Sequence, residues 1–169
     1  MKTLIAYFSK DGGNSVDGGI ENLSRGNTEV VAEKIAKLTG GELYQLIPVE
    51  PYPNNYLACT ERAKREADEG AFPAIANLKD SIDEYDVIYL GFPNWYRSYP
   101  RLIATFLKSF DFTGKTIKPF CTNEEGAFGI GELELRATLK TATLKEGFAV
   151  KGSEADECDL ELSAWVNKY

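Results

Sequence analysis

The sequence predicts an α/β protein with a doubly wound, five-stranded parallel sheet and helices on both faces. Three observations lead to this prediction. Strand and helix signals alternate along all 169 residues, as in a series of β-α units. Several strand signals are almost continuously apolar, which is typical of strands buried on both faces of a parallel sheet. No repeat, low-complexity tract or linker rich in proline and glycine divides the chain, so we expect residues 1–169 to form a single domain.

The first half of the chain contains two strand-helix pairs. The predicted elements are a buried strand at 3–8, a helix at 29–38, an outer strand at 42–47 and an exposed, charged helix at 56–69. The first helix places Val31, Ile35 and Leu38 at helical spacing, and Gly40-Gly41 ends it. The second strand alternates only weakly, and a loop punctuated by prolines follows it.

The second half contains three further strands. The predicted elements are a buried strand at 87–90 closed by Gly91 and Pro93, a helix around 102–107, a strand at 116–121, a helix at 131–144, a short strand at 147–150 and a closing helix at 154–166. Pro119 lies inside the fourth strand, which requires a local irregularity of the sheet. The natural order for five such strands is 2-1-3-4-5.

The composition restricts where the protein acts and what it binds. Hydrophobic residues make up 43% and charged residues 27% of the chain, close to the globular average. We expect a cytoplasmic protein, since no run approaches the ~18 apolar residues of a membrane span and no signal peptide precedes the first strand. The three cysteines are widely spaced, which argues against a disulfide framework or a zinc site.

The charge balance and the absence of histidine exclude further functions. The net charge of −7 disfavours nucleic acid and anionic membranes as partners and favours a protein with a basic patch. Because the chain has no histidine, Ser-His-Asp and Cys-His nucleophiles, histidine acid-base catalysis and most transition-metal sites are excluded. We therefore expect a bound group to carry the chemistry.

Candidate binding residues follow three of the strands, where ligands bind in open α/β sheets. Ser9 and Lys10 follow the first strand, and Gly26-Asn27-Thr28 opens a helix whose N-terminus could bind an anion. Asn27 and Thr28 are also common helix caps, so a purely structural role stays open. Asn94, Trp95 and Tyr96 follow the third strand and could hold a planar ligand or merely cap the core. The segment from Thr122 to Gly131 is rich in glycine, which permits close approach of a ligand or simply suits a surface loop.

Three motifs together resemble the flavodoxin family, over nearly the whole chain. They are Y-F-S followed by G-N-T and an amphipathic helix, then G-F-P-x-W-Y, and then F-C-T-x-E-x-G. The resemblance implies a flavodoxin-like fold and noncovalently bound FMN. By position, it implies three groups of cofactor-binding residues: Ser9, Lys10, Asn27 and Thr28 at the phosphate, Pro93, Asn94, Trp95, Tyr96 and Arg97 along the isoalloxazine, and Thr122, Asn123, Glu124, Glu125 and Gly126 at its pyrimidine edge.

The chain departs from the family pattern in each loop. Residues 10–25 interrupt the phosphate loop, and Arg25 stands where the family has Thr. Residues 9–15 offer an alternative register, but the amphipathic helix follows Thr28, so we favour Gly26-Asn27-Thr28. Asp17-Gly18 is a hairpin-turn signal, which predicts an exposed flap, with a disordered excursion as the alternative. Tyr96 replaces a second Trp, and the acidic pair Glu124-Glu125 is expected to change redox tuning more than binding.

Two functions are compatible with these residues. The protein could carry single electrons between a reductase and a basic protein acceptor, with its acidic surface steering the encounter. It could instead be an FMN-dependent NAD(P)H:quinone-type oxidoreductase. We favour the carrier, because the domain is small and has no second dinucleotide fingerprint. A phospho-receiver domain of the same topology needs acidic residues where Ser9 and Phe92 stand, so we exclude it.

Overall fold

The computed structural model describes residues 1–168 and contains one large parallel sheet. Its strands are β1 (Thr3–Tyr7), β4 (Glu42–Gln45), β5 (Val87–Pro93), β6 (Thr116–Asn123), β7 (Thr143–Leu144) and β8 (Phe148–Lys151). The order is β4-β1-β5-β6-β7, and β8 also pairs with β6. All of these pairings are parallel. With β8 counted as the fifth strand, the predicted order 2-1-3-4-5 is confirmed.

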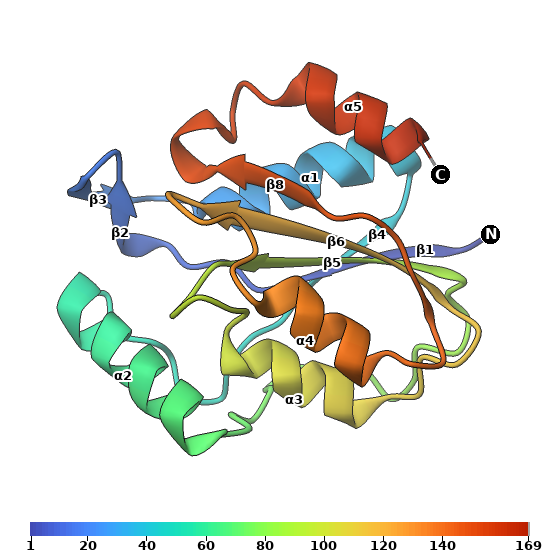
Figure 1. Ribbon diagram of the computed structural model, residues 1–169, viewed down its shortest axis with the longest axis horizontal. Coiled ribbons are helices and arrows are strands. Elements are labelled where there is room, and N and C mark those ends of the chain that lie inside the picture. Colours follow the sequence, from blue (N-terminus) through green and yellow to red (C-terminus); the bar gives the residue numbers. More distant parts are fainter. Residues whose placement is uncertain (169) are drawn as a thin grey trace.

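Helices cover both faces of this sheet, as predicted. They are α1 (Asn27–Thr39), α2 (Tyr56–Glu69), α3 (Arg101–Ser109), α4 (Gly131–Thr138) and α5 (Asp159–Asn167), with a short 3-10 helix η1 (Gly152–Glu154). Figure 1 shows α1 and α5 on one face and α3 and α4 on the other. Each face has its own core, with Ile35 and Trp165 in one and Phe106 and Leu135 in the other. Among residues 1–168, no helix is long and apolar enough to cross a membrane.

Strand β6 explains how the sheet accommodates an internal proline. Proline has no N–H to donate to a neighbouring strand. On one side of β6, β7 pairs only with Thr116 and Ile117, and β8 pairs from Phe120 onward. Pro119 lies in the gap between these two partners, so its missing donor interrupts no ladder. This change of neighbour is the local irregularity that the sequence required.

Strand β5 is longer than the predicted 87–90. It continues through Gly91 to Pro93 because β6 remains paired with it up to Thr122. A Cβ atom at Gly91 would lie only 2.1 Å from the ring of Phe120 on β6. The glycine therefore makes room for this buried ring and does not end the strand. As a result, the strand carries the following loop to the edge of the sheet.

Two helix predictions were wrong in their bounds. The predicted helix 131–144 ends at Thr138, and Thr143 instead donates its N–H to Lys115 of the sheet (2.8 Å). Threonine favours strands because its β-branched side chain packs well on a pleated surface. The predicted helix 154–166 begins only at Asp159, because short-range bonds from Ala155 to Gly152 and from Glu157 to Glu154 hold the preceding segment in tight turns.

The predicted flap at residues 10–25 is an antiparallel hairpin. Its strands are β2 (Gly12–Val16) and β3 (Gly19–Leu23), and they form a separate two-stranded sheet. Asp17 and Gly18 form the turn, both with positive φ, as a tight hairpin turn requires. The hairpin lies at the carboxyl end of the large sheet, next to α2 (Figure 1). The hairpin prediction is confirmed.

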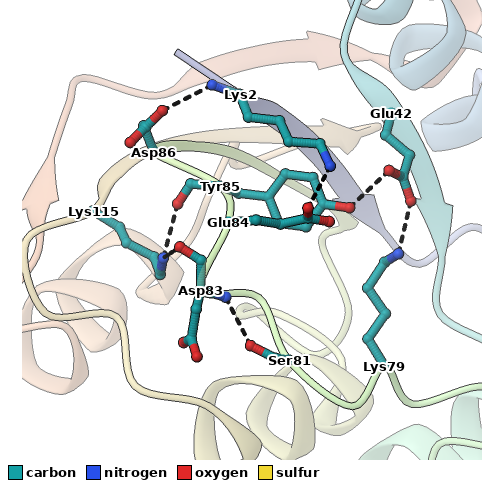
Figure 2. Close-up of polar contacts among 9 residues, drawn as sticks. All are labelled: Lys2, Glu42, Lys79, Ser81, Asp83, Glu84, Tyr85, Asp86 and Lys115. Atoms are coloured by element: carbon teal, nitrogen blue, oxygen red, sulfur yellow. Dashed lines mark hydrogen bonds and ion pairs between the residues drawn. The ribbon is translucent and has the colours of Figure 1, made fainter.

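The opposite, amino-terminal edge of the sheet is held by a polar network. Figure 2 shows the Tyr85 hydroxyl donating to Glu42 at the start of β4 (2.7 Å), and Lys79 donating to the other oxygen of the same carboxylate (2.7 Å). Lys115, just before β6, donates to the carbonyl of Tyr85 (2.8 Å), and Lys2 forms an ion pair with Glu84 (2.6 Å). These contacts join the starts of four neighbouring strands. The network therefore anchors the amino-terminal edge of the sheet.

Candidate functional site

A cavity of about 430 Å³ opens at the carboxyl ends of β1, β5 and β6. Its walls come from the hairpin, the start of α1, one side of α2, the loops after β5 and β6, and the turn after β8. The lining residues are Lys10, Gly13, Asn14, Ser15, Gly18, Asn27, Thr28, Tyr56, Cys59, Thr60, Ala63, Pro93, Asn94, Trp95, Tyr96, Thr122, Asn123, Glu124, Glu125 and Gly152. Ligands bind at this edge in open α/β sheets, so this cavity is the candidate site.

The first turn of α1 supplies hydrogen-bond donors to the cavity. The amides of Asn27 and Thr28 have no acceptor within the helix, because they belong to its first turn. The next amide, that of Glu29, donates to the hydroxyl of Ser9 (3.0 Å), so Ser9 caps the helix. A Cβ atom at Gly26 would lie 2.2 Å from this hydroxyl, which explains the glycine. The exposed donors and the positive end of the helix dipole suit an anion.

Two threonines join this helix to the end of β6. The hydroxyl oxygens of Thr28 and Thr122 lie 2.8 Å apart, and both side chains are buried. Each hydroxyl carries one proton, and their mutual hydrogen bond uses only one of the two. The second proton is therefore available to a ligand in the cavity. This pair connects the start of α1, where the phosphate loop was predicted, to the end of β6.

The loop after β5 has a strained backbone. Trp95 and Ser98 exchange two backbone hydrogen bonds (2.8 and 3.2 Å), and between them Tyr96 and Arg97 both have positive φ. This is the geometry of a type I′ turn, which usually contains Asn or Gly. The side-chain amide of Asn94 holds the turn against the loop after β6 by donating to the carbonyl of Ala127 (2.7 Å). Strain of this kind concentrates at functional sites.

Trp95 lines the cavity as its aromatic wall, together with Tyr56 and Tyr96, and its indole is supported from behind. Phe8 meets it edge to face at a centroid distance of 5.2 Å, and Tyr52 does so at 4.9 Å. The Tyr52 hydroxyl donates to Glu66 (2.7 Å), which also forms a buried ion pair with Arg62 (2.9 Å). Burial, followed by the Glu66 carboxylate, raises the pKa of Tyr52 well above its usual range. The indole therefore rests on a fixed polar cluster.

The loop after β6 brings a carboxylate to the first turn of α1. Glu124 accepts a hydrogen bond from the Asp17 amide at the tip of the hairpin (3.1 Å) through Oε2. Its Oε1 is buried and has no hydrogen-bond partner among residues 1–168. A Cβ atom at Gly152 would lie 2.8 Å from this oxygen and 2.2 Å from the side-chain amide of Asn27. Only glycine therefore fits after β8, and an acceptor remains for a ligand.

The hairpin side of the cavity carries a buried cation and a thiol. Lys10 is 8% exposed, and its Nζ donates to the carbonyl of Asp11. Within the described part of the chain it forms no ion pair with a carboxylate, so its charge remains available to an anionic ligand. Burial raises the pKa of the neighbouring Cys59 thiol. No cluster of residues within 1–168 could hold a metal ion.

The structure brings together most of the predicted site residues. Lys10, Asn27, Thr28, Pro93, Asn94, Trp95, Tyr96, Thr122, Asn123, Glu124 and Glu125 all line the cavity. Ser9, Arg97 and Gly126 do not line it. Asn14 and Ser15, which belong to the alternative register of the phosphate loop, also line it, although α1 begins at Asn27 as we favoured.

The wall contributed by α2 and the glycine after β8 were not predicted from the sequence. Tyr56, Cys59, Thr60 and Ala63 face the cavity from α2. The sequence predicted this helix only as charged and exposed. The signal that could have revealed the wall is the spacing of the small and aromatic residues at positions 56, 59, 60 and 63, which share one helical face. Gly152 had no local signal, because its role depends on contacts with Asn27 and Glu124.

The fold defines a doubly wound α/β protein. Its cavity, at the carboxyl ends of the strands, suits an anionic ligand that contains an aromatic ring. Comparison gives the family: the flavodoxin family model matches residues 2–169, so the chain belongs to the flavodoxin family. No curated protein matches the chain.

Three solved structures show the same fold over nearly the whole chain. A flavoprotein from Bacteroides uniformis is 30% identical, with 99% of this chain and 98% of that chain covered and a TM-score of 0.75. One from Bacteroides eggerthii is 29% identical, with 98% and 96% covered and a TM-score of 0.77. A flavoprotein from Lactobacillus acidophilus in complex with FMN is 22% identical, with 92% and 97% covered and a TM-score of 0.64.

The residues of the cavity fit FMN. The first turn of α1 and the Thr28-Thr122 pair offer donors to a phosphate, and Trp95 offers an aromatic surface. The Oε1 of Glu124, which has no partner among residues 1–168, offers an acceptor. These are the groups that an anionic ligand with a flat ring and polar substituents requires. Membership of the flavodoxin family supports FMN as the cofactor.

Proposed function

We propose that this protein binds FMN in the cavity at the carboxyl ends of β1, β5 and β6 and carries single electrons to a protein acceptor. The observation that supports this function is the combination of donors from α1 with an aromatic wall in one cavity. Membership of the flavodoxin family supports FMN as the cofactor that occupies this cavity. The bound flavin supplies the redox chemistry.

The residues of the chain bind and orient the cofactor. Asn27 and Thr28 hold the phosphate at the first turn of α1, where the helix dipole favours negative charge. Trp95 supports one side of the ring, and its edge-to-face contacts with Phe8 and Tyr52 keep the indole from rotating. The hairpin forms one wall of the cavity through Gly13, Asn14, Ser15 and Gly18.

The charges around the cavity support a basic protein as the acceptor. The hairpin presents Asp11, Asp17 and Glu21 to solvent, and Glu125 is exposed on the loop after β6. Together with the net charge of −7, this acidic rim would steer a partner that carries a basic patch. Such steering weakens as ionic strength rises, because salt screens exposed charges.

An anaerobic stopped-flow experiment tests the proposed function. The purified protein is reconstituted with FMN and mixed separately with NADH, NADPH and a flavodoxin reductase supplied with NADPH. We expect the flavin absorbance to bleach rapidly only with the reductase, and the reduced protein to reduce cytochrome c at a rate that falls with salt. Rapid bleaching by NADH or NADPH alone would support an FMN-dependent oxidoreductase instead. Failure to bind FMN would refute both functions.

A further inference from the structure

Glu124 has a carboxylate with one oxygen in use and, among residues 1–168, one without a partner. Oε2 accepts the amide of Asp17 (3.1 Å), and Oε1 is buried without a hydrogen-bond partner within residues 1–168. Leaving a buried polar atom without a partner destabilises a protein, and more so when the atom is charged. A ligand that donates a hydrogen bond to Oε1 removes this destabilisation.

The position of Glu124 restricts which part of a ligand can donate. Its Oε1 lies beside Gly152 and the side chain of Asn27, at the first turn of α1. Trp95 follows β5, whereas Gly152 follows β8, and these two strands lie on opposite sides of β6. The Oε1 of Glu124 therefore lies away from the aromatic wall and next to the side chain of Asn27.

A phosphate and a flavin ring are both poor candidates for this donor. An ionised phosphate only accepts hydrogen bonds, and it repels a carboxylate. The ring is expected against Trp95, across β6 from Gly152. In FMN, a polyol chain links the phosphate to the ring, and each of its hydroxyls can donate to a carboxylate.

Resting on the proposed function, we propose that Glu124 is a specificity-determining residue that selects the polyol chain of the flavin. Its Oε1 accepts a hydrogen bond from a chain hydroxyl, while its Oε2 fastens the hairpin at Asp17. The same residue thus joins the hairpin to the ligand. The role differs from the redox tuning that the acidic pair was expected to provide.

Three flavins that differ by one group each test this role. Lumiflavin has the ring alone, riboflavin adds the polyol chain, and FMN adds the phosphate. The dissociation constant of each is measured by fluorescence titration with the wild-type protein, Glu124→Ala, Glu124→Gln and the control Glu161→Ala. Glu161 is exposed on α5, away from the cavity, and its change removes the same charge as Glu124→Ala.

We expect Glu124→Ala to weaken riboflavin and FMN by the same factor, about tenfold, which corresponds to about 1.4 kcal/mol. Lumiflavin affinity should not change. Glu124→Gln should weaken the same two ligands less, because its carboxamide can still bond to the Asp17 amide and to a hydroxyl. In the ligand-free protein, hydrogen exchange at the Asp17 amide should be faster in Glu124→Ala than in the wild type. Glu161→Ala should behave as the wild type throughout.

Other patterns overturn the proposal. An equal loss for all three flavins would place Glu124 at the ring or show that the alanine variant disrupts the cavity. A change for FMN alone, in either direction, would place Glu124 at the phosphate. Unchanged affinities would leave Glu124 as a hairpin contact only. If the wild-type protein bound none of the three flavins, the proposed function would fail and this inference with it.

Discussion

The rings of Tyr52 and Trp95 meet edge to face, with their centroids 4.9 Å apart and their planes at 81°. Through this contact the aromatic wall of the cavity rests on a buried ion pair, because the Tyr52 hydroxyl donates to Glu66 and Glu66 pairs with Arg62. The guanidinium of Arg62 also lies over the Tyr52 ring, 4.0 Å from its centroid. The stability of this cluster and the shape of the cavity are therefore linked.

Replacing Tyr52 with Phe should destabilise the protein by about 1.5–3 kcal/mol, because the buried Glu66 carboxylate loses its hydroxyl donor. The ring and its contact with Trp95 are retained, so FMN affinity should change little. Urea denaturation and FMN titration measure the two effects. A matched control is Tyr89→Phe, which removes the hydroxyl of another buried tyrosine, one for which the described residues provide no hydrogen bond, and which should therefore cost much less. Equal losses in the two variants would contradict the role of the charged acceptor.

Replacing Thr28 with Ala should weaken FMN binding by about 1–3 kcal/mol, because a hydrogen bond to a charged phosphate is lost while the helix N-terminus stays. Riboflavin affinity should change far less, since riboflavin has no phosphate. Titration of both ligands gives the comparison. Because Thr28 and Thr122 share one hydrogen bond, the double variant with Thr122→Ala should cost less than the two single changes together. Equal weakening of both ligands would show that Thr28 serves only the helix.

Shortening the hairpin should separate folding from binding. Gly26 lies beside the carbonyl of Lys10, since a Cβ atom on it would be 2.7 Å from that oxygen. Residues 11–25 can therefore be replaced by a single Thr between Lys10 and Gly26 without moving the ends. We expect a cooperatively folded protein, because the hairpin is a sheet of its own, but weaker binding of FMN, because one wall is lost. Circular dichroism during urea denaturation would reveal the opposite result, loss of cooperative unfolding.

Stability should fall in alkaline solution between about pH 10 and pH 12. Burial, and next the bond to Glu42, raise the pKa of Tyr85 from 10.0 to about 12. A group whose pKa is higher in the folded state stabilises the protein fully below the unfolded pKa and loses this contribution as the pH rises through the folded pKa. Denaturation midpoints measured across this range should fall less steeply for Tyr85→Phe than for the wild type. An identical slope would mean that Tyr85 does not contribute.

The elements that the sequence predicted well are those with a strong local pattern. The apolar runs of β1, β5 and β6 and the helical spacing of Val31 and Ile35 are repeated on faces that become buried, so local and tertiary preferences agree. The predicted C-terminal end of α4 and the predicted start of α5 were wrong, because contacts with neighbouring segments determine them. Thr143 pairs with β6, and Gly152 and Glu154 accept short-range hydrogen bonds before α5 can begin.

The candidate site was likewise predictable from the sequence only in part. The loops after the strands could be predicted because topology alone brings their ends to one edge. The α2 wall could not, since Cys59 and Ala63 reach the cavity only through the way that the helix packs beside the hairpin. The orientation of the Glu124 side chain depends on its hydrogen bond with the amide of Asp17, which is 107 residues away in the sequence. No local pattern carries this information.

The hairpin is joined to three neighbouring segments of the cavity rim by the chain itself and by hydrogen bonds. It begins directly after β1, its Gly13 amide bonds to Asn54 before α2 (3.0 Å), and its Asp17 amide bonds to Glu124 after β6. Loops that are already fastened to one another lose little further freedom when a cofactor arrives, so less of the binding free energy goes into ordering the protein. A protein built in this way would keep its receptor shape between successive cofactor molecules, and could exchange a spent or damaged flavin without refolding its rim.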